Sequence, residues 1–281
     1  MIRFTRNIKS FSGMGWGQIP TVNLTGGPTI QEIMLDTNDG AGNFLAPADI
    51  LYVRLSLNGD VLIDVTGEEL RMLETYKGLF SEDGRFIIPL SDVSANTLPG
   101  QLVGGLVTFP SDTITLDVAL AGAGARTWQP TLNASYEVTA SEQARVWLPR
   151  IRSMNFDCSA TGYNDITTLP RGPRIQRAHM LGTISELIVL KNRLNLFERT
   201  SDRNTFLLKR TGRVPQAGYY HFDPIALGFN QVEGFETRDA TESLTFRVNV
   251  AAAQNVRCLL ETVEQVAGAG ATGSNPKPVA A

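Results

Sequence analysis

Histidine is the side chain that most often holds a metal or moves a proton near neutral pH, and the chain has two, His179 and His221. A metal-dependent β-sandwich enzyme needs several histidine and carboxylate ligands that converge on one point. His179 falls in an expected strand, and His221 lies well beyond it in the sequence. This pattern predicts two structural histidines, each satisfied by its own partners, and no metal centre.

Other catalytic patterns are missing from the sequence. No Gly-x-Ser-x-Gly elbow occurs, and no Ser, His and Asp order stands out. The segment Gly13–Gly17 reads GMGWG, but it follows no strand and contains no Gly-Lys-Ser/Thr. We therefore expect neither an enzyme nor a cofactor.

Asp36 and Asp39 are weak candidates for calcium ligands. They lie in the turn-prone loop DTNDG, but the loop lacks the alternate spacing and the terminal Glu of an EF-hand. A solvated loop is the other interpretation, and Glu82-Asp83-Gly84 is a similar case. Ligands that several subunits share would not be visible in one sequence, so calcium at subunit interfaces stays open.

The N-terminal segment 1–18 combines Arg3, Arg6 and Lys9 with interleaved Ile and Phe. We expect an extended or partly helical arm. Two partners fit it equally: an anionic lipid surface, which attracts basic residues near it, or a neighbouring protein of the same assembly.

The elements that must position any site are organised around one module, Ile50–Gly78. Alternating apolar residues predict two strands, and Asn58-Gly59 between them is the strongest short signal for a hairpin. Thr66 and Glu69 have the spacing of a capping box at a helix start. Gly78 is placed to end that helix.

The same module recurs as Ile184–Gly212, so that Ile50 aligns with Ile184 and Gly78 with Gly212. Strand, turn, strand, cap, helix and glycine recur in the same order, which is typical of an internal repeat. A second pair of motifs, Pro28-x-Ile30-Gln31 and Pro173-x-Ile175-Gln176, aligns at a slightly larger shift. The chain therefore contains a duplicated unit.

Each unit contains its module, which includes one helix, and further short strands with period-2 alternation. Many short strands broken by Gly, Pro and Asn predict an all-β sandwich, of which jelly rolls are one kind. We expect an arm at 1–18, one jelly roll at 19–145, another at 146–266 and a flexible tail at 267–281. The strands expected are 29–35, 85–90, 113–120 and 134–139 in the first roll, and 219–225, 243–250 and 256–263 in the second.

Composition adds limits. No apolar run approaches the roughly 20 residues of a membrane-spanning helix, and the N-terminus does not read as a secretory signal. Cys158 and Cys258 suit two buried thiols in a reducing cytosol. The net charge of −3 argues against direct nucleic-acid binding. Residues 1–145 carry −7 and residues 146–281 carry +4, which either reflects a head-to-tail ring of subunits or is composition drift.

The start of the second unit resembles the major capsid proteins of corticoviruses, which are double jelly-roll coat proteins of membrane-containing icosahedral bacteriophages. The residues that carry this resemblance are Trp147-Leu148, Arg152, Asn155-Phe156, Gly162, Ile166, Leu169-Pro170-Arg171, Arg174-Ile175 and His179, together with Ile19-Pro20-x-Val22 and Val53–Leu62 in the first unit.

The resemblance implies two tandem eight-stranded jelly rolls, each with a short helix, and a structural function as a major capsid protein. It implies homotrimers that form pseudo-hexagonal capsomers, and an icosahedral shell over an internal membrane. It also implies a vertex or penton protein, minor membrane proteins as partners, calcium between subunits and assembly in the cytoplasm of the host bacterium. The alternative is a carbohydrate-binding β-sandwich, such as a viral spike or a lectin-like module. A jelly-roll enzyme is the third interpretation, disfavoured by the missing ligand cluster.

Overall fold

A computed structural model describes residues 3–8, 10–102 and 104–266 of the chain. Its first half contains, in order, β1 (Phe4–Ile8), β2 (Thr21–Leu24), β3 (Thr29–Asp36), η1 (Pro47–Asp49), β4 (Ile50–Leu57), β5 (Asp60–Val65), α1 (Gly67–Tyr76), β6 (Arg85–Pro89), α2 (Leu98–Leu102), β7 (Leu106–Val107), β8 (Ile114–Leu120) and β9 (Asn133–Thr139). The second half contains β10 (Trp147–Cys158), β11 (Gly162–Ile166), β12 (Arg174–Leu181), β13 (Ile184–Lys191), β14 (Leu194–Thr200), α3 (Ser201–Arg210), β15 (Tyr219–Phe222), α4 (Asn230–Glu233), β16 (Phe235–Glu236), β17 (Leu244–Val250) and β18 (Gln254–Gln265).

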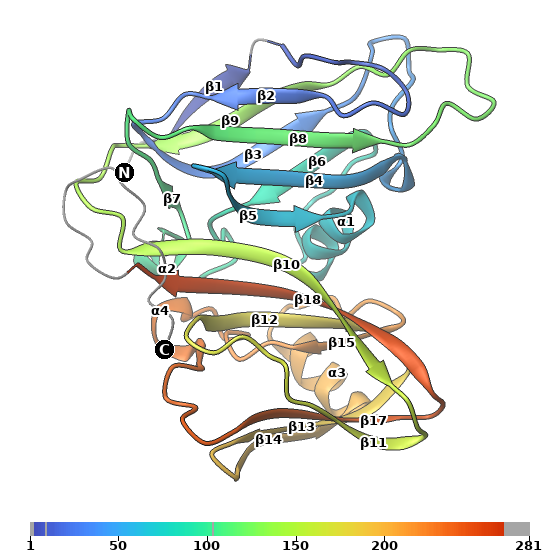
Figure 1. Cartoon of the computed structure of the whole chain (residues 1–281), viewed down its shortest axis with the longest axis vertical. Coiled ribbons are helices and arrows are strands. Elements are labelled where there is room, and N and C mark those ends of the chain that lie inside the picture. Colours follow the sequence, from blue (N-terminus) through green and yellow to red (C-terminus); the bar gives the residue numbers. More distant parts are fainter. Residues whose placement is uncertain (1–2, 9, 103, 267–281) are drawn as a thin grey trace.

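The two halves have the same strand arrangement. In the first, β1-β9-β3-β6 form one sheet and β5-β4-β8-β2 form the opposing layer. In the second, β10-β18-β12-β15 and β14-β13-β17-β11 repeat the two orders strand for strand. Figure 1 shows the halves as two stacked sandwiches, the first in blue to green and the second in yellow to red. We call them the first roll (β1–β9) and the second roll (β10–β18), and together they form the predicted double jelly roll.

Strand register confirms the alignment of the two modules in detail. β5 pairs with β4 and β14 pairs with β13, and each hairpin has a register irregularity at the same place, beside Leu62 and Leu196. Asn58 and Asn192 both have positive φ, 52° and 50°, in the turns that the sequence predicted. The second motif is confirmed as well, because β3 and β12 each bulge at its glutamine, Gln31 and Gln176.

Helix α1 begins and ends where its sequence predicts. Thr66 accepts a hydrogen bond from the N–H of Glu69 at 3.1 Å, and the Glu69 carboxylate accepts one from the N–H of Thr66 at 2.8 Å. Gly78 follows the helix with a φ of +69°, a conformation that costs glycine least. In α3, the equivalent Thr200 makes no side-chain cap bond, although Gly212 repeats the positive φ.

Each roll has its own hydrophobic core. One buried cluster centres on β3, β4, β5 and β8, and the other on β12, β13 and β17. Cys158 and Cys258 belong to the second cluster as free, buried thiols, as predicted. Leu208 and Leu259 of the second roll join the first cluster, so apolar packing continues across the junction.

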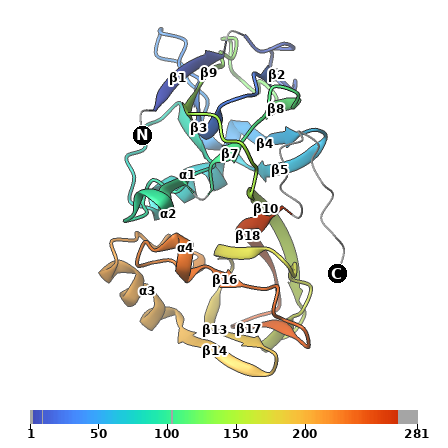
Figure 2. The ribbon, with the colours of Figure 1, turned by 90° about the vertical axis from the view of Figure 1, so that its left-hand side faces the viewer.

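The junction also contains backbone pairing. β5 of the first roll pairs in parallel with β10 of the second, with Ile63 opposite Ile151 and Asp64 opposite Arg152. One continuous sheet therefore runs from β15 in the second roll to β2 in the first. Figure 2 shows α1 and α2 on the same side of the molecule as α3 and α4. The two rolls thus have the same orientation, and the edge of one meets a different edge of the other.

The N-terminal segment is extended over Phe4–Ile8, which is one of the two conformations that the sequence predicted. It pairs with β9 as the edge strand β1. It takes in the first roll the place that β10 takes in the second. The short elements α2, α4, β7 and β16 were not predicted. No helix among the described residues is long and apolar enough to cross a membrane.

Candidate functional site at the junction of the two rolls

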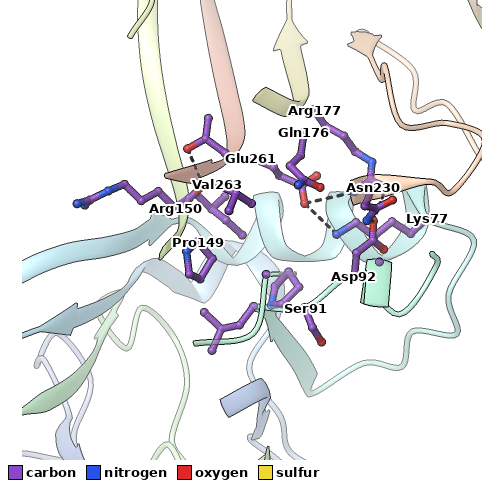
Figure 3. A pocket seen from close by; sticks show the side chains of 16 residues that line it. Lys77, Ser91, Asp92, Pro149, Arg150, Gln176, Arg177, Asn230, Glu261 and Val263 are labelled. Atoms are coloured by element: carbon purple, nitrogen blue, oxygen red, sulfur yellow. Dashed lines mark hydrogen bonds and ion pairs between the residues drawn. The ribbon is translucent and has the colours of Figure 1, made fainter. Parts of the chain in front are cut away.

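Charged side chains gather in the layer between the rolls. Figure 3 shows Lys77 and Asp92 of the first roll meeting Arg177, Asn230 and Glu261 of the second. They line a cavity of about 30 Å³, which has room for about one water molecule. Charged side chains are rarely buried unless they are paired, so this layer is the candidate functional site.

Alternation along β12 directs these side chains to the junction. Ile175, Ala178 and Met180 belong to the second core. Arg177 and His179 point to the other face of the sheet, where the first roll covers them and leaves them 1% and 0% exposed. The covering element is the C-terminal end of α1.

Arg177 is the centre of an ionic network that spans both rolls. Its guanidinium lies 2.6 Å from Asp92, 3.2 Å from Asp223 and 3.6 Å from Glu261. Lys77 lies 2.9 Å from Glu261, and Arg213 lies 3.3 Å from Asp223. Three cations thus face three carboxylates, and this balance is what burial of charge requires.

The ionisation of the acidic groups follows from these neighbours. Burial alone would raise the pKa of Glu261, but Lys77, Arg177 and His179 outweigh it and hold the pKa well below its ordinary value. Burial also opposes ionisation of Asp92, and Arg177 above all keeps its pKa well below the ordinary value. Both carboxylates are therefore ionised at neutral pH.

The two histidines meet in this layer. Nδ1 of His179 lies 2.7 Å from Nδ1 of His221, and Nε2 of His179 lies 2.9 Å from Glu261. The N–H of Gln216 donates to Nε2 of His221 at 3.1 Å. His221 therefore carries its proton on Nδ1 and donates it to His179, whose own proton on Nε2 is donated to Glu261.

Both histidines are neutral in this arrangement. Burial, and then the neighbouring His179, lowers the pKa of His221 to about 2. Burial is also the largest influence on His179 and lowers its pKa despite the hydrogen bond to Glu261. The sequence predicted structural histidines, which is what the hydrogen bonds show, but not their contact with each other.

Tyr76 connects the first roll to both histidines. Its ring stacks on His221 at 4.3 Å and meets His179 edge-on at 4.9 Å. Its hydroxyl donates to Asp223 at 2.8 Å. The backbone carbonyl of Tyr76 accepts a hydrogen bond from the N–H of Val214 at 2.9 Å. The side chain thus fills a socket on the outer face of the second roll.

Two further ion pairs lie beside this network. Arg257 donates to Glu69 at 2.7 Å, which links β18 to α1. Arg150 lies 2.5 Å from Asp60 and 2.6 Å from Glu264, which links β10 to the β4–β5 hairpin. The whole arrangement holds the rolls in one relative position and, among the residues that the structure describes, contains no activated nucleophile.

The predicted calcium candidates lie elsewhere. Asp39 accepts hydrogen bonds from the N–H groups of Ala41 and Asn43 and so stabilises its own loop. Asp36 accepts from the N–H of Asn38 and lies 3.7 Å from Arg85. Among residues 3–8, 10–102 and 104–266, no group of three or more His, Cys, Asp or Glu could hold a metal ion. Calcium at Asp36 and Asp39, and calcium between subunits, both stay predictions.

The predicted arm residues lie at a free sheet edge. Arg6 is exposed in β1, and Arg3 lies close enough to Glu32 to act on its pKa. Lys9 lies outside the described residues. Contact of this segment with a membrane or a neighbouring capsomer stays a prediction.

Sequence reasoning missed Lys77, Arg177, Asp223 and Glu261. The alternation of β12 was a usable signal, because Arg177 and His179 share one face of the strand. In an isolated second roll, the face of β12 that carries Arg177 and His179 would be exposed to solvent. Only the other sandwich of the repeat, stacked against it, makes the face an interior.

Comparison with known proteins agrees with this architecture. Residues 5–139 match the family model for the viral coat protein P2 N-terminal domain, and residues 148–266 match the model for the viral coat protein P2 C-terminal domain. A comparison with curated protein sequences found no match.

Several solved structures with a similar fold are viral capsid proteins. The major capsid protein P2 of bacteriophage PM2 is 19% identical, with a TM-score of 0.85 over 96% of this chain and 100% of that one. The STIV MCP is 13% identical, with a TM-score of 0.70 over 94% and 97%. The PBCV-1 virus capsid is 12% identical, with a TM-score of 0.63 over 93% of each chain. The two family models together cover most of the sequence, and the chain belongs to the viral coat protein P2 family, as a double jelly-roll major capsid protein with a structural and non-enzymatic function.

Proposed function

We propose that the protein builds its shell as homotrimers, each a pseudo-hexagonal capsomer of six rolls, which tile an icosahedral capsid over an internal membrane. The observation that carries this proposal is the head-to-tail junction within the chain. The β5 edge and α1 of the first roll meet the β10 edge and the adjoining sheet face of the second.

Each roll carries both kinds of surface, but each uses only one within the chain. In the part of the chain that the structure describes, the first roll has an unpaired β1 edge and the second has an unpaired β14 edge. A head-to-tail contact repeats until a ring closes or a filament grows. Three chains close a ring of six rolls if the contact between chains copies the contact within a chain and if that contact turns each roll by one sixth of a full rotation.

The opposite charges of the two halves, −7 and +4 by sequence, favour the same contact between first and second rolls of neighbouring subunits. Further partners follow from a closed shell: a vertex or penton protein at the fivefold positions, and the membrane or its minor proteins inside. Assembly in the host bacterial cytoplasm suits the two free buried thiols.

Calcium between subunits is a further part of the proposal. Its ligands would be carboxylate and carbonyl oxygens contributed by more than one chain. Chelation with EDTA should then lower the melting temperature of purified trimers, and added calcium should restore it. A trimer that melts at the same temperature in EDTA would contradict calcium binding while leaving the trimer itself intact.

Sedimentation of the purified protein tests the main proposal. We expect a species with three times the 30.6 kDa chain mass, and electron microscopy of particles should show hexagonal capsomers. A protein that stays monomeric at micromolar concentration would overturn the proposal. Binding of a monomer to sugars would instead support the carbohydrate-binding alternative.

A further inference from the structure

The junction within the chain provides a template for a contact between chains, because each element has an equivalent in the other roll. β5 with α1 corresponds to β14 with α3, as the matching hairpin registers show. β10 corresponds to β1, since Ile151 pairs with Glu261 as Thr5 pairs with Glu137. Among residues 3–8, 10–102 and 104–266, neither of the two equivalent surfaces, β14 with α3 and β1, is covered by a partner of this kind.

Burial differs sharply between the equivalent edges. Leu62 in β5 is 0% exposed, whereas the identical residue Leu196 in β14 is 49% exposed. Phe4 in β1 is 58% exposed, and Leu194 in β14 is 65% exposed. A free edge strand with exposed apolar side chains is a site for pairing with another chain. The difference marks β1 and β14 as edges without their partner.

The side chains at these edges also match as pairs. Within the chain, Arg150 binds Asp60 at 2.5 Å, and the equivalents of these two residues are Phe4 and Leu194. An ionic pair at the junction within the chain thus corresponds to an apolar pair at the edges β1 and β14. Both members of the pair differ in the same way.

The neighbouring pair keeps its charges. Arg152 stands opposite Asp64 in the parallel pairing of β10 and β5, and its equivalents are Arg6 and Glu198. An arginine again faces a carboxylate. Such complementarity fixes register and orientation in an interface.

The first roll also has an empty socket where the second roll holds Tyr76. The positions of His221, Asp223 and Arg177 around Tyr76 correspond to Ile87, Pro89 and Glu32. These three residues line an open pocket of about 260 Å³, together with Glu74 and Phe80. Phe80 is 88% exposed, although it occupies the place of Val214, whose N–H binds the carbonyl of Tyr76.

Two carboxylates, Glu32 and Glu74, line this pocket together with one amine, that of Lys77, which is already paired with Glu261 at 2.9 Å. Neither the Glu32 nor the Glu74 side chain forms a hydrogen bond or ion pair among the described residues. Burial raises the pKa of Glu74 to about 7, and it also raises the pKa of Glu32. Lys77 offsets the cost of charging Glu74 only in part, and a second cation between the two carboxylates would relieve it further.

The equivalent of Tyr76 is Arg210, which is exposed at the C-terminal end of α3. We propose that a second copy of this chain docks with β14 and α3 on the outer face of the first roll, so that Arg210 enters the pocket beside Glu32 and Glu74. In the same contact, Phe4 packs on Leu194 and Arg6 pairs with Glu198 of the neighbouring copy. This inference rests on the proposed homotrimer, and it assigns Arg6 to the adjacent subunit in place of a membrane.

Charge reversal tests the socket. Arg210→Glu should leave the subunit folded, since the side chain is exposed, and should raise the concentration at which trimers half-dissociate at least tenfold. The matched control is Arg171→Glu, at an exposed arginine in the loop before β12, which should leave this concentration unchanged. Adding Glu32→Arg to Arg210→Glu should restore a large part of the loss.

Cross-linking tests the edge pairing. Arg6→Cys with Glu198→Cys should give covalently linked chains on oxidation, up to a closed trimer. Arg152→Cys with Asp64→Cys is the control and should link only residues of one chain, because their backbones pair within it. The native Cys158 and Cys258 are buried and should not interfere.

The outcomes separate the two proposals. A wild-type protein that never forms trimers ends the proposed function and this contact with it. Wild-type trimers that persist unchanged in Arg210→Glu, or whose Arg6→Cys and Glu198→Cys chains fail to link, end the contact alone. Dissociation of Arg210→Glu, rescued by Glu32→Arg, establishes the socket.

Discussion

Nδ1 of His179 and Nδ1 of His221 lie 2.7 Å apart in the layer between the rolls, and one proton occupies the space between them. A charged His179 would carry a second proton on Nδ1, facing the one on His221. A charged His221 would lose the lone pair on Nε2 that accepts from the N–H of Gln216. The roll junction is therefore built for one protonation state, in which both rings are neutral.

Acid should loosen this junction. The folded pKa values of both histidines lie below the ordinary 6.5, so the unfolded chain binds more protons and stability falls as the pH drops below about 6.5. The lowered pKa of His221 alone should reduce the free energy of unfolding by on the order of 2–3 kcal/mol between about pH 6.5 and 4.5. Denaturant unfolding across this range measures the effect.

Glu74 opposes this trend, because its raised pKa of about 7 means that protonation stabilises the fold as pH falls toward 4.5. The informative quantity is therefore the difference in slope between wild type and His221→Asn. The variant should lose stability less steeply with acid, although it starts lower. Equal slopes would show that His221 takes up no proton on unfolding.

Lys77→Met should destabilise the subunit strongly. It removes a cation that is 2.9 Å from Glu261 and leaves that carboxylate buried with less compensation. Loss of one partner from a buried pair costs about 3–5 kcal/mol. Arg54→Met is the control, since the Arg54–Asp64 pair is about 40% exposed and should contribute less than about 1 kcal/mol. Similar losses of unfolding free energy in both variants would refute a special role for Lys77.

The two helix starts offer a test with an internal control. Thr66→Ala removes a side-chain cap and should cost about 1 kcal/mol. Thr200→Ala changes the equivalent residue of α3, which makes no such bond, and should cost much less. The measurement is the free energy of unfolding of the two variants. An equal loss in both would contradict the difference between the two helix caps.

The ends of the helices α1 and α3 offer a second test with an internal control. A Cβ at Gly78 would lie 3.3 Å from the carbonyl oxygen of Gly212 in the other roll, whereas a Cβ at Gly212 would meet nothing within 4 Å among the described residues. Both glycines have positive φ, so Gly212→Ala should cost about 1 kcal/mol. Gly78→Ala should cost more, because the roll junction must also shift. Equal losses in subunit unfolding would mean that the contact between the glycines is loose.

Local sequence signals predicted the parts of the fold that local physics controls. Asn58-Gly59, the Thr66 and Glu69 box and Gly78 each act within a few residues, and the structure confirms each one. Alternation located strands such as β4, β8 and β17, whose faces lie against a core, but it did not locate the twelve-residue strand β10. The repeat then provided the second roll.

The site could not be derived in this way. His179 and His221 are neighbours because β12 and β15 pair, and Tyr76 reaches them only from the other roll. β1 was missed for a related reason: its side chains are mostly exposed, so Phe4–Ile8 has no alternation between a buried and a solvated face. Its pairing with β9 is a tertiary relationship that no local pattern encodes.

The parallel contact of β5 with β10 has a mechanical consequence. It makes a single hydrogen-bonded ladder from β15 to β2, so the rolls are joined without a hinge in the part of the chain that the structure describes. Tension applied across the two rolls is carried by the backbone hydrogen bonds between successive strands. The ionic network beside this sheet resists sliding of one roll past the other. Under internal pressure, such a subunit behaves as one rigid body. Deformation of the shell must then occur at the contacts between subunits.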